Sequence, residues 1–287
     1  TYFKKISTIY MSIITLITDF GTKDHFVAKI KGAIISDLPQ ASIVDISHQI
    51  SPFNIMEAAY VIENSYQHFP EKTIHIIGVD SENTPECSHI VLKLNEQYFI
   101  CADNGIMSIV CHNIKPDEIF EINIHNKIDS QNSTLKIFAQ VACHLAKGGE
   151  PEIIGKRINK IRSAKSIAPF INDEKNQIIG SVIYIDNYGN VVTNIKHSFF
   201  KEASKGRKYE ISARNHKFKR IYNNYSEIVD YNILEEKRND EGRALALFNS
   251  SNYLEIAIYK SNPLNVGTAA SLLGLKILDS ITINFLK

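Results

Sequence analysis

Four short apolar segments that each run into an aspartate constrain the fold of this sequence more than any other feature. The clearest is the isoleucine-rich stretch 73–79, which is followed at once by Asp80 and a polar cluster. A short β-branched run of this kind predicts a buried strand with a carboxylate at its end. The other three segments have the same form and lead into Asp19, Asp45 and Asp186. Because ligands of open α/β sheets collect beyond the carboxyl ends of the strands, this pattern predicts one polar site built from strand ends.

The first half of the chain alternates between strand and helix patterns. Strands are expected at 12–18, 43–46 and 74–79, and apolar residues at helical spacing predict helices at 25–38 and 55–66 between them. This β–α–β–α–β order predicts a parallel sheet with right-handed crossovers. The elements expected to complete this half are strands at 89–94 and 97–102 and helices at 106–110 and 134–147.

The second half shows short alternating strands separated by polar or glycine-containing turns, which is typical of a barrel-like β domain. These strands are expected at 179–185, 191–195, 207–213, 216–222, 244–248, 253–258 and 281–286. We therefore expect an α/β N-terminal domain with a mainly parallel sheet and a smaller all-β, barrel-like C-terminal domain. The expected boundaries are 11–165 for the first domain, 166–177 for a linker and 178–287 for the second domain, with residues 1–10 as a short extension.

The composition excludes several classes of function. The 287 residues carry a formal net charge of +1, so no general field attracts nucleic acid or an anionic membrane surface. No apolar run is long enough to span a bilayer. The four cysteines form neither a CxxC pair nor a zinc spacing, which favours reduced thiols in a cytoplasmic protein.

Two of the strand-end motifs contain groups that suit a nucleoside ligand. Asp19 precedes a glycine and could accept hydrogen bonds from both hydroxyls of a ribose, or it could simply cap a helix or turn. The turn 186–190, Asp-Asn-Tyr-Gly-Asn, offers an acid, an aromatic ring and an amide. These groups could bind an ammonium, stack on a flat ring and pair with ring nitrogens, but the same sequence is also good hairpin-turn chemistry.

Other motifs argue against metal and phosphate chemistry. Asp45 and His48 have a spacing that could suit two metal ligands, but no third ligand is nearby, and loop hydrogen bonding is the preferred interpretation. The sequence contains neither a GxSxG nucleophile elbow nor a GxxxxGK[ST] phosphate loop. Hydrolase chemistry of the Ser-His-Asp type and ATP-type phosphate chemistry are therefore not expected.

In order along nearly the whole chain, these motifs resemble those of the S-adenosyl-L-methionine (SAM) hydroxide adenosyltransferase family, which is related to the fluorinating and chlorinating SAM halogenases. The matching segments are 17–21 with 31–32, 44–45 with 48 and 51–52, 79–80, 103–105, 138–139 with 144–146, 186–195, and 253–257 with 269–270. The resemblance implies two domains as described above and a homotrimer that binds SAM between domains of neighbouring subunits. It implies no metal and no cofactor, with SAM or adenosine as the small-molecule partner.

The resemblance also implies roles for individual residues. Asp19 would hold the ribose hydroxyls, and Phe53 would pack near the reacting carbon. The implied reaction is displacement at the ribose C5′ by water or hydroxide, which gives adenosine and L-methionine. Because the sulfonium is a good leaving group, catalysis would consist mainly of positioning and desolvating the nucleophile.

Five residues of the second half have implied ligand contacts. Asp186 would bind the methionine ammonium, and Ser250 would contact the methionine end of the substrate. Tyr188 and Asn190 would contact the adenine, with Tyr225 as a second aromatic group.

The sequence departs from the family pattern at the reacting centre. The hydrolytic loop resembles VDPGVGT with an arginine just beyond it, whereas here Asp80 is kept and the arginine position falls near Cys87. The family's histidine falls on Ser133, beside Thr134, and a second expected arginine is Ser251. Glu82 or His89 could substitute as a base or an orienting group.

These departures leave several hypotheses open. The first is a SAM hydrolase in which Asp80 positions the water and Asn83, Ser133 and Thr134 are its neighbours. The second is a catalytically weakened protein that holds SAM or adenosine without turnover. The third is an enzyme for another nucleoside-like ligand. Halogenation is least favoured, because Asp80 would repel a halide where the halogenases carry a tyrosine.

Overall fold

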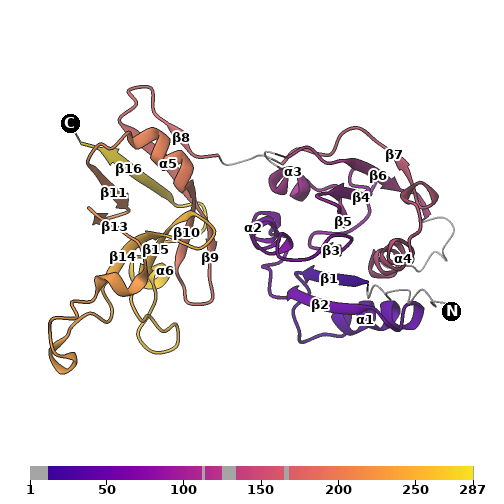
Figure 1. Ribbon diagram of the computed structural model, residues 1–287, viewed down its shortest axis with the longest axis horizontal. Coiled ribbons are helices and arrows are strands. Elements are labelled where there is room, and N and C mark those ends of the chain that lie inside the picture. Colours follow the sequence, from indigo (N-terminus) through magenta and orange to yellow (C-terminus); the bar gives the residue numbers. More distant parts are fainter. Residues whose placement is uncertain (1–11, 112–113, 125–133, 165–167, 287) are drawn as a thin grey trace, which may run out of the picture. The chain divides into compact units, whose positions relative to one another are not determined.

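A computed structural model describes residues 12–111, 114–124, 134–164 and 168–286 of the chain (Figure 1). The chain divides into two compact units, residues 1–165 and 166–287. Each unit contains one large sheet with its own hydrophobic core. Within the described residues, no helix is both long enough and apolar enough to cross a membrane.

The first unit is a seven-stranded mixed sheet with helices on both faces. Its strands are β1 (Ile13–Thr18), β2 (Ser42–Ser47), β3 (Ile74–Gly78), β4 (His89–Leu94), β5 (Gln97–Ala102), β6 (Glu118–Ile122) and β7 (Gly155–Arg157). Its helices are α1 (Phe26–Asp37), α2 (Ile55–Tyr66), α3 (Ile106–Val110), α4 (Thr134–Ala146) and the 3₁₀ turn η2 (Pro151–Ile153). The strand order is β2-β1-β3-β5-β4-β6-β7.

The expected parallel sheet is only half of the observed one. Strands β2, β1, β3 and β5 are parallel, whereas β5, β4, β6 and β7 are joined by antiparallel pairs. The reversal follows from the two-residue connection between β4 and β5. Asn95 and Glu96 have φ angles of 50° and 57°, which is the conformation of a tight type I′ hairpin turn. A two-residue turn can connect only antiparallel neighbours.

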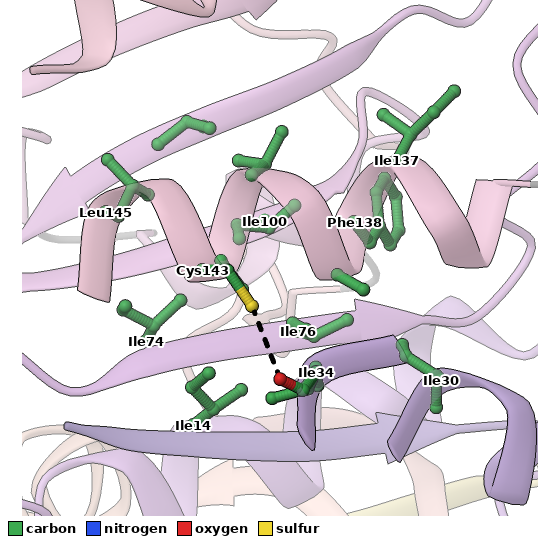
Figure 2. Close-up of a cluster of buried hydrophobic side chains, with 14 of the residues drawn as sticks. Ile14, Ile30, Ile34, Ile74, Ile76, Ile100, Ile137, Phe138, Cys143 and Leu145 are labelled. Atoms are coloured by element: carbon green, nitrogen blue, oxygen red, sulfur yellow. Dashed lines mark hydrogen bonds between the residues drawn. The ribbon is translucent and has the colours of Figure 1, made fainter. Parts of the chain in front are cut away.

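Burial on both faces explains why the strands of this unit read as continuous apolar runs. Along β3, Ile74 and Ile76 face the cluster that contains α1 and α4, while Ile77, and Val79 just after the strand, face the cluster that contains α2 and α3. Figure 2 shows the first cluster, in which α4 lies over the sheet beside α1 and the thiol of Cys143 points to the carbonyl of Ile34, 3.8 Å away. Each fully buried isoleucine contributes about 1.5–3 kcal/mol relative to an exposed one.

The second unit is a nine-stranded, almost entirely antiparallel sheet. Its strands are β8 (Phe170–Ile171), β9 (Gln177–Ile185), β10 (Val191–Lys196), β11 (Tyr209–Ala213), β12 (His216–Phe218), β13 (Ile221–Tyr222), β14 (Ala244–Phe248), β15 (Tyr253–Ile258) and β16 (Ser280–Phe285). Pairing runs in the order β12-β11-β16-β9-β10-β15-β14-β13, and β8 pairs with β9. The described pairings do not join β12 to β13, so closure into a barrel stays a prediction.

Three expectations for this unit differ from the structure. It is not all-β, because α5 (His197–Ser204) and α6 (Ala269–Leu272) are helical, as are the 3₁₀ turns η3 (Tyr225–Ile228) and η4 (Glu235–Lys237). The strand expected at 216–222 is two strands, because β12 pairs with β11 and β13 pairs with β14. The linker expected at 166–177 contains β8, whose pairing with β9 makes it part of the second sheet.

All four cysteines lie in the described ranges and carry free thiols, as expected. Burial raises the pKa of Cys111 and of Cys143 to about 11 each. These thiols are therefore protonated and act as small apolar side chains.

Candidate active site

The carboxyl ends of β1 and β3 lie side by side and bring Asp19 next to Asp80. These strands are parallel neighbours in which Thr18 pairs with Gly78, so both aspartates follow at the same edge of the sheet. Oδ2 of Asp19 accepts hydrogen bonds from the backbone N–H of Asp80 at 3.3 Å and from that of Phe53 at 2.9 Å. Three of the predicted site residues are thus joined by one carboxylate oxygen.

The two backbone groups that Asp19 binds have strained conformations. Phe53 has a φ of 62° and Asp80 a φ of 44°, both in the left-handed region that non-glycine residues rarely adopt. Each such residue costs about 1–3 kcal/mol and persists only where the surroundings hold it. The Phe53 side chain is 74% exposed. An exposed aromatic ring on a strained, anchored backbone is typical of a ligand-binding position rather than of a core.

Asn104 fixes the Asp80 peptide from the other side and was not predicted as a site residue. Its side-chain amide donates to the carbonyls of Val79 and Asp80, both at 3.0 Å, while its Oδ1 accepts from the N–H of Ile106 at 3.1 Å. Its place in an Asp-Asn-Gly turn after β5 is the sequence signal that could have identified it. Gly105 has a φ of 100°, and a Cβ there would lie 2.9 Å from the Cβ of Ala164, so the turn needs glycine.

The neighbouring acid, Asp103, accepts a hydrogen bond at 2.8 Å from the backbone N–H of Arg162. Burial raises the pKa of Asp103, and the hydrogen bond and charge of Arg162 oppose that rise. The guanidinium of Arg162 also donates to the carbonyl of Glu86 at 3.3 Å. Sequence reasoning assigned no role to Arg162, because the 150–178 region has no regular pattern.

The other predicted neighbours of Asp80 have less defined places. Asn83 is exposed in the loop after β3, and no described contact joins it to Asp80. Thr134 is the first residue of α4 and is half-buried, whereas Ser133 lies outside the described residues. One turn along α4, the Phe138 ring packs against His89 with ring centroids 4.6 Å apart.

His89 holds the loop after Asp80 and is not placed as a base. Its ring is fully buried, and its Nε2 lies 2.9 Å from the carbonyl oxygen of Ser81. His89 therefore connects this loop to α4. Glu82, the other suggested substitute, is exposed.

Asp45 and His48 lie within ion-pair distance of each other, but the buried Nε2 of His48 forms no hydrogen bond among the described residues. Nδ1 of His48 lies 2.8 Å from the Thr18 hydroxyl, and its Nε2 lies 3.1 Å from Oδ1 of Asp45. The other oxygen of Asp45 accepts from Lys31 at 2.6 Å. Among the described residues, no group of three or more His, Cys, Asp or Glu side chains could hold a metal ion.

In the second unit, Asp186 organises the turn between β9 and β10. Its Oδ1 accepts from the N–H groups of Tyr188 and Asn190 at 2.9 and 2.8 Å, and its Oδ2 accepts from the Asn190 amide at 2.9 Å. Asn190 is buried, whereas the Tyr188 ring is 64% exposed. Gly189 has a φ of 73°, and a Cβ there would lie 2.3 Å from that of Thr268. The hairpin-turn chemistry is thus present, and it also presents an aromatic ring to solvent.

Glu255 is a buried acid of the second unit that sequence reasoning missed. Its carboxylate accepts from the Tyr225 hydroxyl at 2.6 Å and from the Asn249 amide at 3.1 Å. Burial raises its pKa, the two hydrogen bonds oppose that rise, and the charge of Asp186 adds to it. The sequence feature that could have identified Glu255 is its charge within the otherwise apolar strand β15.

The contacts of Glu255 connect Tyr225 to the turn that follows β14. Oδ1 of Asn249 also accepts from the N–H groups of Ser251 and Tyr253 at 3.0 and 3.1 Å. This shapes the turn that contains the exposed Ser250. The acid of Glu255 therefore links Tyr225 to the turn that contains Ser250.

Comparison with known proteins agrees with both units. The family model of the SAM hydroxide adenosyltransferase N-terminal domain matches residues 14–155, and that of the C-terminal domain matches residues 180–282. The chain belongs to the SAM hydroxide adenosyltransferase family. The resemblance inferred from the ordered motifs is thereby confirmed.

The chain is similar to several known proteins over most of its length. It is 28% identical to the (R)-S-adenosyl-L-methionine hydrolase of Methanocaldococcus jannaschii over 95% of this chain and 96% of that protein. It is 24% identical to the fluorinase of Nocardia brasiliensis over 68% of this chain and 74% of that protein. A solved structure of an uncharacterized conserved protein from Thermotoga maritima matches with a TM-score of 0.79 and 30% identity, covering 95% of this chain and 99% of that one.

Proposed function

We propose that this protein is an adenosine-forming SAM hydrolase. The observation that carries the proposal is the double hydrogen bond from Asp19 to the backbones of Asp80 and Phe53. These bonds hold three residues close together: Asp19, which would bind the ribose, Asp80, which would bind the water, and Phe53, whose ring would pack near the reacting carbon. The relatives named as (R)-S-adenosyl-L-methionine hydrolases support the same reaction for this chain.

The reaction needs little covalent chemistry from the protein. The water oxygen forms a bond to the ribose C5′, the C5′–S bond breaks, and its electron pair stays on the methionine sulfur. One proton leaves the water, so the products are adenosine, L-methionine and a proton. Because the sulfur is already positively charged, the protein mainly has to position the water and exclude competing solvent.

Each half of the substrate has matching groups. Within the described residues, Oδ1 of Asp19 accepts no hydrogen bond, so it can bind the ribose diol while Oδ2 holds the backbone. The exposed Asp80 carboxylate would accept a hydrogen bond from the attacking water and take its proton. In the second unit, Asp186 carries the charge for the methionine ammonium, and the exposed rings of Tyr188 and Tyr225 suit the adenine.

The test is incubation of the pure protein with each sulfonium epimer of SAM, followed by chromatography for adenosine and methionine. We expect both products, mainly from the (R) epimer that the relatives' names specify. In Asp80→Asn, kcat should fall by about 10²–10³-fold, because a positioned proton acceptor contributes an effect of this order. The control is Asp24→Asn, which changes an exposed acid in the loop after β1 and should keep full activity. Undiminished turnover by Asp80→Asn would show that Asp80 is not the acceptor.

A second candidate, a SAM- or adenosine-binding protein without turnover, is favoured by one observation. Cys87, Ser133 and Ser251 stand where the family pattern has an arginine, a histidine and an arginine. Tight adenosine binding in calorimetry, with no product above the uncatalysed background from either epimer, would select this function over hydrolysis.

We also propose a homotrimer with sites at subunit interfaces, located in the cytoplasm. The family resemblance supports the trimer, and the four free thiols fit a reducing compartment. Light scattering after size exclusion should give about three times the chain mass of 32.4 kDa. A monomer at micromolar concentration would refute the trimer.

A further inference from the structure

Acidic groups accumulate where the first unit is proposed to position its water. Asp19, Asp80 and Asp103 follow β1, β3 and β5, three adjacent parallel strands, so their carboxylates emerge at one edge of the sheet. Asp103 is partly buried there, and this burial raises its pKa. Like charges that gather in a partly desolvated place repel each other unless a cation lies among them.

Arg162 is brought to this edge from a distant part of the sheet. Strand β7 is the edge strand at the end of the sheet opposite β2. Directly after it, the backbone N–H of Ile158 donates to the carbonyl of Ile119 at 2.9 Å and fixes the chain. Ile158 and Ile161 then pack against the cluster under α2 and α3. The segment ends with Ala164 N–H donating to the Ser108 hydroxyl at 2.8 Å. Anchors on both sides of Arg162 give it a defined position.

The contacts of Arg162 bind the loop after Asp80 to the loop after β5. Its backbone N–H donates to Asp103 at 2.8 Å, and its guanidinium donates to the Glu86 carbonyl at 3.3 Å. The two acceptors belong to different strand-end loops. One residue therefore connects both loops and places a permanent positive charge between them.

The pKa of the Cys87 thiol depends on the charged groups at this edge of the sheet. Burial raises the pKa of Cys87, the charge of Arg162 lowers it, and the charges of Asp103 and Asp80 raise it. The guanidinium and both carboxylates therefore all act on one sulfur atom. Cys87 is also the position near which the family pattern has its arginine.

We propose that Arg162 is a positioning residue for the hydrolysis, which ties the carboxylate of Asp103 to the carbonyl of Glu86 and so holds the 81–88 loop in its active shape. It occupies, from a different segment, the region that an arginine near position 87 would fill. Arg162 touches neither substrate nor water in this assignment. It acts through the 81–88 loop, which follows Asp80 in the chain. This role rests on the proposed hydrolase function.

The experiment compares Arg162→Gln and Arg162→Lys with the wild type and with Lys160→Gln. Lys160 is exposed and two residues away, so its replacement removes the same charge without touching either loop. For Arg162→Gln we expect kcat to fall by about 10- to 100-fold with KM changed by less than about threefold, because a misplaced water costs turnover more than binding. Arg162→Lys should recover part of kcat, and Lys160→Gln should match the wild type.

A second readout does not depend on turnover. Mass spectrometry follows iodoacetamide alkylation of Cys87 at constant pH and low salt. Loss of the nearby cation should raise the thiol pKa and slow alkylation at least about twofold in Arg162→Gln but not in Lys160→Gln. Unchanged alkylation in Arg162→Gln would refute the placement of the guanidinium.

The two readouts separate the possible failures. Slower alkylation with undiminished kcat in Arg162→Gln would overturn the positioning role while leaving the hydrolase function in place. Wild-type protein that forms no adenosine would overturn the hydrolase function and the catalytic role with it, and the alkylation rates would still decide the placement. Thermal unfolding of each variant shows whether a loss of kcat reflects loss of the fold.

Discussion

At the scale of single residues, one carboxylate oxygen maintains two unfavourable backbone conformations. Asp19 binds the N–H groups of Phe53 and Asp80, which lie 34 and 61 residues away in the chain. Both of these residues have positive φ angles. Hydrogen bonds to a charged acceptor contribute about 1.5–3 kcal/mol each, which is comparable to the cost of such conformations. The shape of the candidate site therefore depends on Asp19.

Replacement of Asp19 tests this dependence. Asp19→Ala should lower the free energy of unfolding by about 2–4 kcal/mol, because two backbone donors lose their acceptor. Asp19→Asn keeps an acceptor oxygen and should lose less than half as much, although it removes the charge. Urea denaturation measures both. Equal losses in the two variants would mean that the charge, and not the acceptor, holds the loops.

The buried imidazole of His75 makes the stability of the fold depend on pH. Its fully buried ring lies 2.7 Å from the Thr15 hydroxyl and 2.6 Å from Oε1 of Gln97. Because Gln97 donates its own amide to the Phe69 carbonyl at 3.0 Å, its oxygen faces the imidazole, which places the ring proton on Nε2. Burial lowers the pKa of His75 to about 4, with the Gln97 hydrogen bond opposing the change.

The sign of the pH effect follows from this lowered pKa. Between about pH 6.5 and pH 4 the unfolded chain binds a proton at this site that the folded protein does not. The free energy of unfolding should therefore fall as the pH drops through this window, by up to about 3 kcal/mol from His75 alone. Urea denaturation at several pH values measures it. The same slope in His75→Gln would assign the effect to other groups.

At the scale of elements, the β4–β5 hairpin shows how a short turn sets strand direction. Helix α2 and strands β4, β5, β14 and β15 have the bounds that the sequence predicted. These are strongly periodic segments that Asn, Gly or Pro residues delimit. Helix α5 was not predicted, because its polar and aromatic residues follow β10 directly without a turn signal. Local patterns thus identified most elements, whereas the antiparallel half of the first sheet required the turn geometry.

The conformation of the hairpin turn favours glycine over the residue that the chain has there. Glu96 occupies the second turn position with a φ of 57°, where glycine carries no steric penalty. Glu96→Gly should raise the free energy of unfolding by about 0.5–1 kcal/mol, despite losing an exposed ion pair with Lys93. Glu71→Gly, at an exposed position without a positive φ, should lower it. A loss of stability in Glu96→Gly would show that the turn conformation is not strained.

At the scale of the whole molecule, the two units carry different parts of the proposed chemistry. The first unit has the acids at the strand ends, and the second has a buried acid that positions an aromatic ring and an amide-rich turn. The proposed displacement needs no nucleophilic side chain, because water is the nucleophile. The proposed role of the protein is to hold a reactive sulfonium and one water.

We propose that the hydrolysis needs neither a metal ion nor a cofactor. The electrophilic carbon is activated by the positive sulfur of the substrate, and the leaving group is a neutral thioether, so a Lewis acid has no developing charge to stabilise. Dialysis against EDTA should therefore leave kcat within about twofold of its starting value, a change of about 0.4 kcal/mol in the activation free energy. Addition of Mg²⁺ to the dialysed protein is the control. Loss of activity that Mg²⁺ or Zn²⁺ restores would overturn the proposal.

Sequence patterns alone predicted most of the periodic elements, the alternation of strands and helices from β1 to β3, and the resemblance to the family. These follow from burial patterns over a few residues and from ordered motifs. The pairing of polar groups that are distant in the chain became visible only in the folded protein. Asp19 with Asp80, Arg162 with Asp103 and Tyr225 with Glu255 are 61, 59 and 30 residues apart. Such contacts depend on strand order and register, and no local pattern along the chain encodes them.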